Sequence, residues 1–107
     1  MNQSADLTLG AISTLIRQKE LSVTEVLNNY LDRIKQFETT LKAWVSIDEE
    51  NALAKARVLD KELRDNNSRG LLHGIPFGVK DIFWVKDSVT SAGSPIYRDF
   101  VPKQHAT

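Results

Sequence analysis

Apolar residues in the first two-thirds of the chain recur every three or four positions, the spacing of one face of an α-helix. The first such set follows Thr8, a residue type that caps helix N-termini, and predicts a short helix. Its apolar members are Leu9, Ile12, Leu15 and Ile16.

The second set begins at Ser22-Val23-Thr24-Glu25, a capping-box pattern in which the serine and the glutamate each bond the other's backbone amide. Behind it one apolar stripe predicts the clearest helix of the chain. The stripe consists of Val23, Val26, Leu27, Tyr30, Leu31, Ile34 and Phe37.

Asp48 can cap a third helix, and the aromatic and β-branched run Ala43–Ile47 before it predicts a short strand. The apolar face of this helix is Ala52, Leu53, Ala56, Leu59 and Leu63. Its acidic residues are expected on a solvated face rather than in a carboxylate pair suited to acid–base work; they are Glu49, Glu50, Asp60 and Glu62.

The polar stretch 65–70 divides the chain, and glycine, proline and apolar residues become frequent beyond it. Ile75, Phe77 and Val79 alternate and predict a short strand that ends at Lys80. A second apolar run covers 82–85, and a loop punctuated by glycine and proline follows.

Helices over 8–65 followed by strand and loop material over 70–107 predict an α/β fold class, with the helices at the rim of a sheet. One or two short strands cannot form a self-sufficient sheet, because their edges lack partners. We therefore expect residues 1–107 to be the N-terminal part of one larger domain.

Composition narrows the function classes. Fourteen basic and fourteen acidic residues cancel, which gives no electrostatic case for direct binding to nucleic acid or to an anionic membrane. The absence of cysteine excludes disulfides and thiolate metal sites. The first six residues lack the features of a signal peptide, and no apolar run reaches the ~20 residues of a membrane span. We expect a cytoplasmic location.

Lys80 is the candidate catalytic residue. A lysine at the end of an apolar strand most often reaches water with its ammonium group. If it is buried instead, desolvation favours its neutral form, which can act as a base in Ser–Lys hydrolases. The residues alone leave both interpretations open.

The run Leu72-His73-Gly74-Ile75-Pro76-Phe77-Gly78-Val79-Lys80-Asp81, followed by Thr90-Ser91-Ala92-Gly93-Ser94-Pro95, resembles the start of the amidase signature family. The resemblance implies a mixed-sheet fold and a Ser–Ser–Lys triad in which Lys80 is the base. A serine would attack the carboxamide carbon, a second serine in a cis peptide would relay the proton, and backbone amides would form the oxyanion hole. No cofactor is implied.

A lysine has an ordinary pKa of about 10.4, so a lysine base needs hydroxyl and amide neighbours rather than carboxylates. We therefore expect Asp81 to point away from Lys80 and anchor the loop. The family places both triad serines in a Gly/Ser-rich loop further along, which this sequence lacks. Ser91 and Ser94 are expected to be turn-forming hydroxyls, with a role in lining the substrate cleft as the alternative.

The two histidines lie 32 positions apart without ligand partners at i+3 or i+4, so no zinc site is predicted. His73 is expected to bond a backbone group. His105 stands where members of the family commonly carry aspartate, which argues against a capping or ion-pair role there. Trp44 and Trp84 are expected to be core or interface aromatics.

The resemblance implies a hydrolase of carboxamide C–N bonds. Because the 107 residues lack the two triad serines, we expect the isolated chain to be inactive. The substrate would be a small aliphatic or aryl amide, a peptide C-terminal amide, or a glutamine whose ammonia is passed on. A homodimer, or the partner subunits of a glutamyl-tRNA amidotransferase, are the partners left open. The alternative is a non-catalytic helical interaction module.

Overall fold

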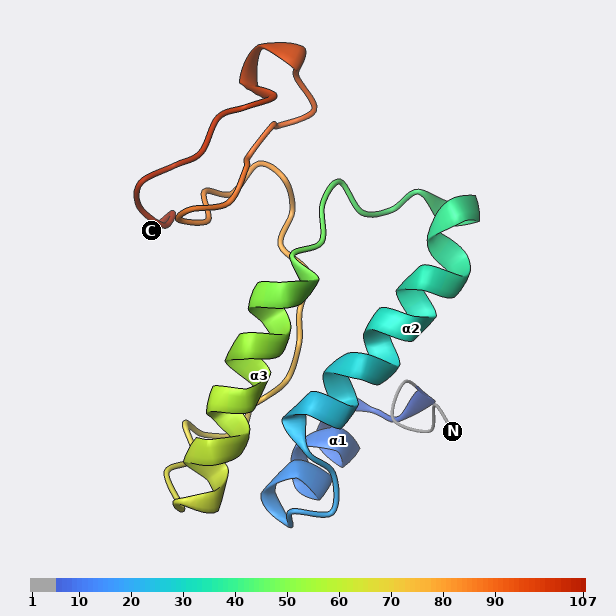
Figure 1. The fold of residues 1–107 in the computed structure, drawn as a ribbon, viewed down its shortest axis with the longest axis vertical. Helices are drawn as coiled ribbons and strands as arrows, with labels where there is room; N and C mark the ends of the chain where they lie inside the picture. The colour runs from blue at the N-terminus through green and yellow to red at the C-terminus, as the bar shows by residue number, and fades with distance from the viewer. Residues whose placement is uncertain (1–5) are drawn as a thin grey trace. The chain divides into compact units, whose positions relative to one another are not determined.

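A computed structural model describes residues 6–107, which fall into two compact units that divide between Pro76 and Phe77. The first unit contains three helices, α1 (Leu9–Arg17), α2 (Val23–Leu41) and α3 (Glu49–Arg64) (Figure 1). The second unit contains one short 3-10 helix, η2 (Pro95–Tyr97). No helix in the part of the chain that the structure describes is both long and apolar enough to cross a membrane.

All three predicted helix starts are confirmed. The Thr8 hydroxyl accepts a hydrogen bond from the Ala11 amide at 3.2 Å, and Asp48 accepts one from the Asn51 amide at 3.1 Å. At α2 the capping box is complete, because Ser22 Oγ accepts from the Glu25 amide and the Glu25 carboxylate accepts from the Ser22 amide. Local capping chemistry therefore sets where each helix begins.

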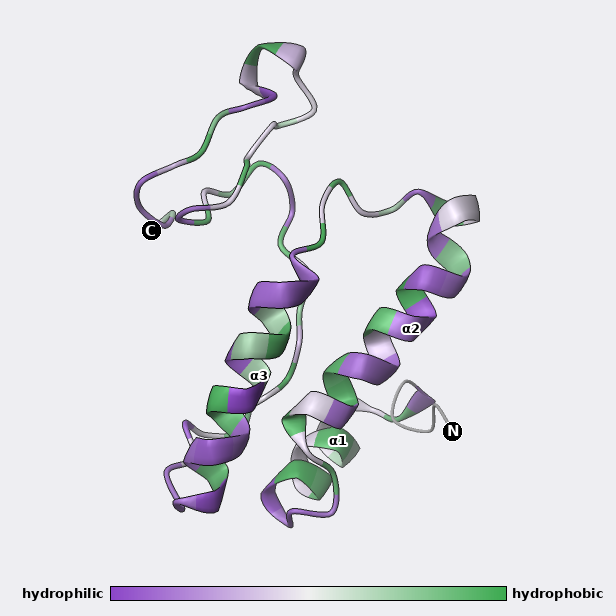
Figure 2. Cartoon of the chain, in the orientation of Figure 1, coloured by the Kyte–Doolittle hydropathy of each residue, from purple (hydrophilic) through white to green (hydrophobic). Residues whose placement is uncertain are grey.

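The core of the first unit lies where the apolar faces of α1, α2 and α3 meet. Figure 2 shows apolar positions alternating with polar ones along each helix, as expected of amphipathic helices. The buried cluster consists of Ile12, Ile16, Val23, Val26, Ala56 and Leu63. Phe37, in the fifth turn of the α2 stripe, is 43% exposed, and the Arg33 guanidinium carbon lies 5.8 Å from the centre of its ring.

The expectation that the acidic residues of α3 lie on a solvated face is wrong for Asp60. Its carboxylate is half-buried and accepts hydrogen bonds from the Val23 amide at 2.6 Å, and from the Thr24 amide and hydroxyl at 3.1 and 2.6 Å. These are the free amides of the first turn of α2. Asp60 thus caps one helix from another, and fixes α3 beside α2 (Figure 1).

The segment after α3 returns to the helices through Gly74. Gly74 has φ +78°, which favours glycine, and a Cβ atom there would overlap the side chain of Val23. Ile75 packs against the buried cluster, and Ser13 Oγ donates to the Leu71 carbonyl at 2.5 Å. Glycine is therefore required for this close approach.

The predicted strands are not observed among the described residues. Ala43–Ile47, the segment leading to Lys80 and the run 82–85 are all irregular, so only the helical part of the predicted α/β fold is seen. A strand needs a neighbouring strand to pair its backbone groups, and the described residues offer these segments none.

Backbone hydrogen bonds between distant loop segments hold the second unit together. Asp87 donates to the Pro102 carbonyl at 3.0 Å, Thr90 to the Phe100 carbonyl at 2.9 Å, and Ala106 to the Trp84 carbonyl at 2.8 Å. The rings of Trp84 and Phe100 lie 5.6 Å apart. The tryptophans are not core residues in the described chain, because Trp44 and Trp84 are 42% and 45% exposed.

We predict that Asp60→Ala destabilises the helical unit, because the Val23 and Thr24 amides lose their acceptor. The expected cost is roughly 1–3 kcal/mol, read as a lower urea midpoint of the helical circular dichroism signal. Asp65→Ala is the matched control, since Asp65 lies near the same end of the helix but makes only an exposed ion pair with Lys61. Equal midpoints for the two variants would contradict the capping role of Asp60.

Candidate functional site

Lys80 is exposed and stands where the irregular segment from Phe77 turns back. Its backbone carbonyl accepts a hydrogen bond from the Phe83 amide at 3.0 Å, so Lys80 is the first residue of a β-turn. Its ammonium group has no hydrogen-bond or ion-pair partner within residues 6–107. Of the two interpretations that the residues left open, an ammonium group that reaches water is the one observed in this part of the chain, where Phe77 is itself 84% exposed.

Asp81 anchors the following loop, as predicted. Its carboxylate accepts a hydrogen bond from the Ser91 amide at 2.9 Å and another from the Ser91 hydroxyl, while its carbonyl accepts one from the Ala92 amide at 2.9 Å. The Ser91 hydroxyl and then its amide lower the pKa of Asp81, against a smaller opposing effect of burial, with weaker help from the Gly93 and Ala92 amides. The carboxylate is thus committed to the loop.

The loop that holds Asp81 is a tight turn over Ser91–Ser94. The Ser94 amide donates to the Ser91 carbonyl at 2.9 Å, and the two central residues have positive φ, +52° at Ala92 and +68° at Gly93. Ser94 Oγ then accepts from the Ile96 amide at 3.3 Å at the start of η2. The predicted turn-forming role of both serines is confirmed, and a role in lining a cleft stays a prediction.

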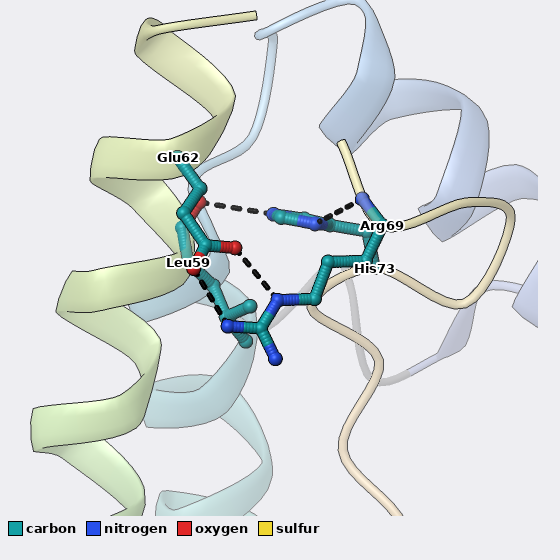
Figure 3. A network of polar contacts seen from close by, with 4 residues as sticks. All are labelled: Leu59, Glu62, Arg69 and His73. Carbon is teal, nitrogen blue, oxygen red and sulfur yellow. Dashed lines mark hydrogen bonds and ion pairs between the residues drawn. The ribbon is translucent and has the colours of Figure 1, made fainter. Parts of the chain in front are cut away.

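His73 bonds backbone groups on both sides of its ring, as predicted (Figure 3). Nδ1 accepts a hydrogen bond from the Arg69 amide at 3.0 Å, and Nε2 lies 2.9 Å from the Leu59 carbonyl, which can only accept. These partners fix the neutral tautomer with its proton on Nε2.

The same figure shows the Arg69 guanidinium bound to both oxygens of Glu62, at 2.6 and 2.7 Å. The cluster joins the 69–73 segment to α3 and is structural.

The His105 ring accepts a backbone hydrogen bond and makes no ion pair among the described residues. Its Nδ1 accepts a hydrogen bond from the Lys86 amide at 3.2 Å, beside the bond from Ala106 to Trp84. It closes the C-terminal end of the second unit onto the segment after Trp84. Within the described residues, no group of three or more acidic or histidine side chains could hold a metal ion.

Sequence reasoning missed two contacts. The Ala92-Gly93 pair and the flanking serines signalled a turn, but nothing in the sequence identified Ser91 as the partner of Asp81. No local signal in the sequence marks Asp60 as a cap of α2, because Asp60 lies 37 positions after Val23 and 36 positions after Thr24. Both contacts depend on tertiary structure.

Comparison with known proteins gives consistent findings. The family model described as Amidase matches residues 25–107. The chain is 40% identical over 101 residues to a Mycobacterium tuberculosis protein provisionally named amidase AmiD, covering 94% of this chain and 21% of that protein. It is 39% identical over 90 residues to a subunit of glutamyl-tRNA(Gln) amidotransferase from Alkaliphilus metalliredigens, covering 84% of this chain and 18% of that protein. The chain thus spans about a fifth of the length of these relatives.

We predict that Asp81 titrates below the ordinary aspartate value of about 3.9, because the Ser91 contacts favour its charged form. A lowered pKa stabilises the folded loop above the ordinary value, and this stabilisation is lost as pH falls through the pKa of the folded state. Carboxyl-carbon NMR titration measures it, and Ser91→Ala should move the pKa upward. A midpoint at or above the ordinary value in the unsubstituted chain would contradict the contact.

Proposed function

This chain belongs to the Amidase family, and we propose that it supplies the base of an enzyme that hydrolyses carboxamide C–N bonds. The observation that carries the proposal is the run from Leu72 to Asp81, which matches the family's lysine motif and lies inside the matched region. Lys80 is the proposed catalytic base.

In the proposed reaction, Lys80 Nζ accepts a proton that leaves a serine hydroxyl by way of a second serine. The serine oxygen bonds the carboxamide carbon, and the C–N bond breaks as the proton returns to the departing nitrogen, releasing ammonia or an amine. Water then hydrolyses the acyl-enzyme by the same proton path in reverse. Both serines would come from a Gly/Ser-rich loop outside these 107 residues.

The environment of Asp81 supports this role for Lys80. A lysine acts as a base only when neutral, and a free carboxylate beside it would favour the charged form. The Asp81 carboxylate is bound to the Ser91 amide and hydroxyl instead, and it makes no ion pair with Lys80. The residue next to the proposed base therefore does not hold it in the charged form.

The relatives suggest two substrate classes. The name amidase fits a small aliphatic, aryl or peptide amide, whereas the name glutamyl-tRNA(Gln) amidotransferase fits a glutamine whose ammonia is passed on. In the second case the chain would work with partner subunits; a homodimer is the other assembly we consider. The net charge of zero gives no support for direct contact with tRNA, and a cytoplasmic location stays a prediction.

We also propose that residues 1–107 are the N-terminal part of a single amidase domain. Large apolar side chains between 77 and 97 are exposed: Phe77, Val79, Ile82, Phe83, Trp84, Val89, Ile96 and Tyr97. Exposed apolar area of this extent favours contact with further protein. The same observation supports the alternative, a non-catalytic interaction module, so an experiment must separate the two.

We predict that Lys80→Ala in the complete protein lowers kcat/KM for amide hydrolysis by at least roughly 10²- to 10⁴-fold, the usual contribution of a general base. Lys80→Arg should be nearly as inactive, because guanidinium does not lose its proton at working pH. The assay is ammonia release from propionamide, benzamide and glutamine. Lys103→Ala, another exposed lysine of the same unit, is the control.

Wild-type turnover by either Lys80 variant would remove Lys80 from the catalytic role. Failure of the unsubstituted complete protein to release ammonia from all three amides would count against the hydrolase itself.

We predict that amide hydrogen exchange in the 107-residue chain is slow in α2 and α3 and fast at Phe77–Lys80, because the amides of that segment donate no backbone hydrogen bond among the described residues and its apolar side chains are exposed. Slow exchange at Phe77–Lys80 in a monodisperse monomer would show a self-sufficient unit. That result would favour the interaction module over the partial amidase domain.

A further inference from the structure

Asp81 is held by the turn at Ser91 through both its side chain and its backbone. The carboxylate accepts from the Ser91 amide at 2.9 Å and from the Ser91 hydroxyl, and the Asp81 carbonyl accepts from the Ala92 amide at 2.9 Å. Two of these hydrogen bonds end on the side chain of Asp81 and one on its main chain. Together they restrict both the backbone and the side chain of the residue that directly follows Lys80.

The turn is shaped to receive an anion. Ala92 and Gly93 have consecutive positive φ values of +52° and +68°, a conformation that a non-glycine residue such as Ala92 rarely adopts. Successive amides in tight turns of this kind form a concave site for negative charge. The Ser91 amide donates to the Asp81 carboxylate and the Ala92 amide donates to the Asp81 carbonyl, so Asp81 and the unfavourable turn conformation stabilise each other.

The turn at Ser91 is itself held by backbone hydrogen bonds to the segment 100–102. Thr90, the residue before it, is only 4% exposed, and its amide donates to the Phe100 carbonyl at 2.9 Å. The neighbouring bond from Asp87 to Pro102 ties the same segment to the same stretch of chain, 100–102. Asp81 therefore contacts a restrained part of the second unit rather than a free loop end.

The consequence falls on Lys80. Lys80 and Asp81 are the first two residues of the β-turn that the Phe83 amide closes by donating to the Lys80 carbonyl at 3.0 Å. Restricting the backbone of Asp81 therefore also restricts the direction in which the Lys80 side chain projects from the backbone. We propose that Asp81, held by the Ser91–Gly93 turn, is a positioning residue that sets the placement of Lys80 and withholds its own carboxylate from the lysine ammonium. The proposal rests on the proposed role of Lys80 as the base.

The test compares Asp81→Asn with Asp87→Asn in the complete protein, using whichever of propionamide, benzamide and glutamine it hydrolyses. The asparagine amide keeps one acceptor oxygen but loses the negative charge and the second acceptor that the Ser91 hydroxyl uses. A small misplacement of a catalytic group can cost about 10²-fold in rate. We expect Asp81→Asn to lower kcat by roughly 10- to 100-fold with KM changed less than about twofold. Asp87 is a matched control, because it is exposed in the same unit and its carboxylate has no partner among the described residues.

Two substitutions of Ser91 show whether Asp81 acts through the turn. They also test the proposal if the Asp81→Asn variant folds poorly. Ser91→Ala removes the hydroxyl and should lower kcat, whereas Ser91→Thr keeps a hydroxyl and should restore most of it. Adding Ser91→Ala to Asp81→Asn should lower kcat little further, since both changes break the same contact. Additive losses, or equal activity of Ser91→Ala and Ser91→Thr, would overturn the proposal.

Lys80→Ala separates this inference from the proposed function. If Lys80→Ala is inactive while Asp81→Asn keeps the wild-type kcat, Lys80 is the base but Asp81 does not position it. If Lys80→Ala keeps wild-type turnover, the proposed function itself fails, whatever Asp81 does.

Discussion

The hydrogen bonds between the Asp81 carboxylate and Ser91 are the interaction on which the functional interpretation depends. They connect the residue after Lys80 to a turn ten positions further on, and they occupy the carboxylate that would otherwise favour a charged lysine. The segment 80–91 thus contains both the proposed base, Lys80, and the serine that binds the neighbouring Asp81 carboxylate, so that this carboxylate does not favour the charged form of the lysine. The low pKa of Asp81 is the electrostatic consequence of the same contact.

The two units of the chain are stabilised in different ways. In the first, capped amphipathic helices bury a shared cluster, and Asp60 joins α3 to the start of α2. In the second, turns and a few backbone hydrogen bonds hold loops together while several large apolar side chains stay exposed. Among the described residues, every buried side-chain N or O atom has a hydrogen-bond partner, and the buried apolar cluster of the first unit is shared by its three helices. The second, which contains the proposed catalytic residue, leaves apolar surface available for further protein.

The sequence predicted the parts of the fold that depend on nearby residues. Ser22 and Glu25, three positions apart, were enough to locate the start of α2, and the stripe behind them gave its buried face. The strands at Ala43–Ile47 and before Lys80 were predicted from the same kind of pattern but did not form, because a strand also needs a distant partner. At the site, the anchoring role of Asp81 followed from the chemistry of a lysine base. Its partner Ser91 did not, since nothing local specifies which turn the carboxylate meets.

An experimental structure of the complete protein near neutral pH is the most direct test of this account. It measures two distances, from the Asp81 carboxylate to Ser91 and from the same carboxylate to Lys80 Nζ. The account predicts hydrogen bonds from the Ser91 amide and hydroxyl and no ion pair with Lys80. An Asp81–Lys80 ion pair, with Ser91 released, would contradict it.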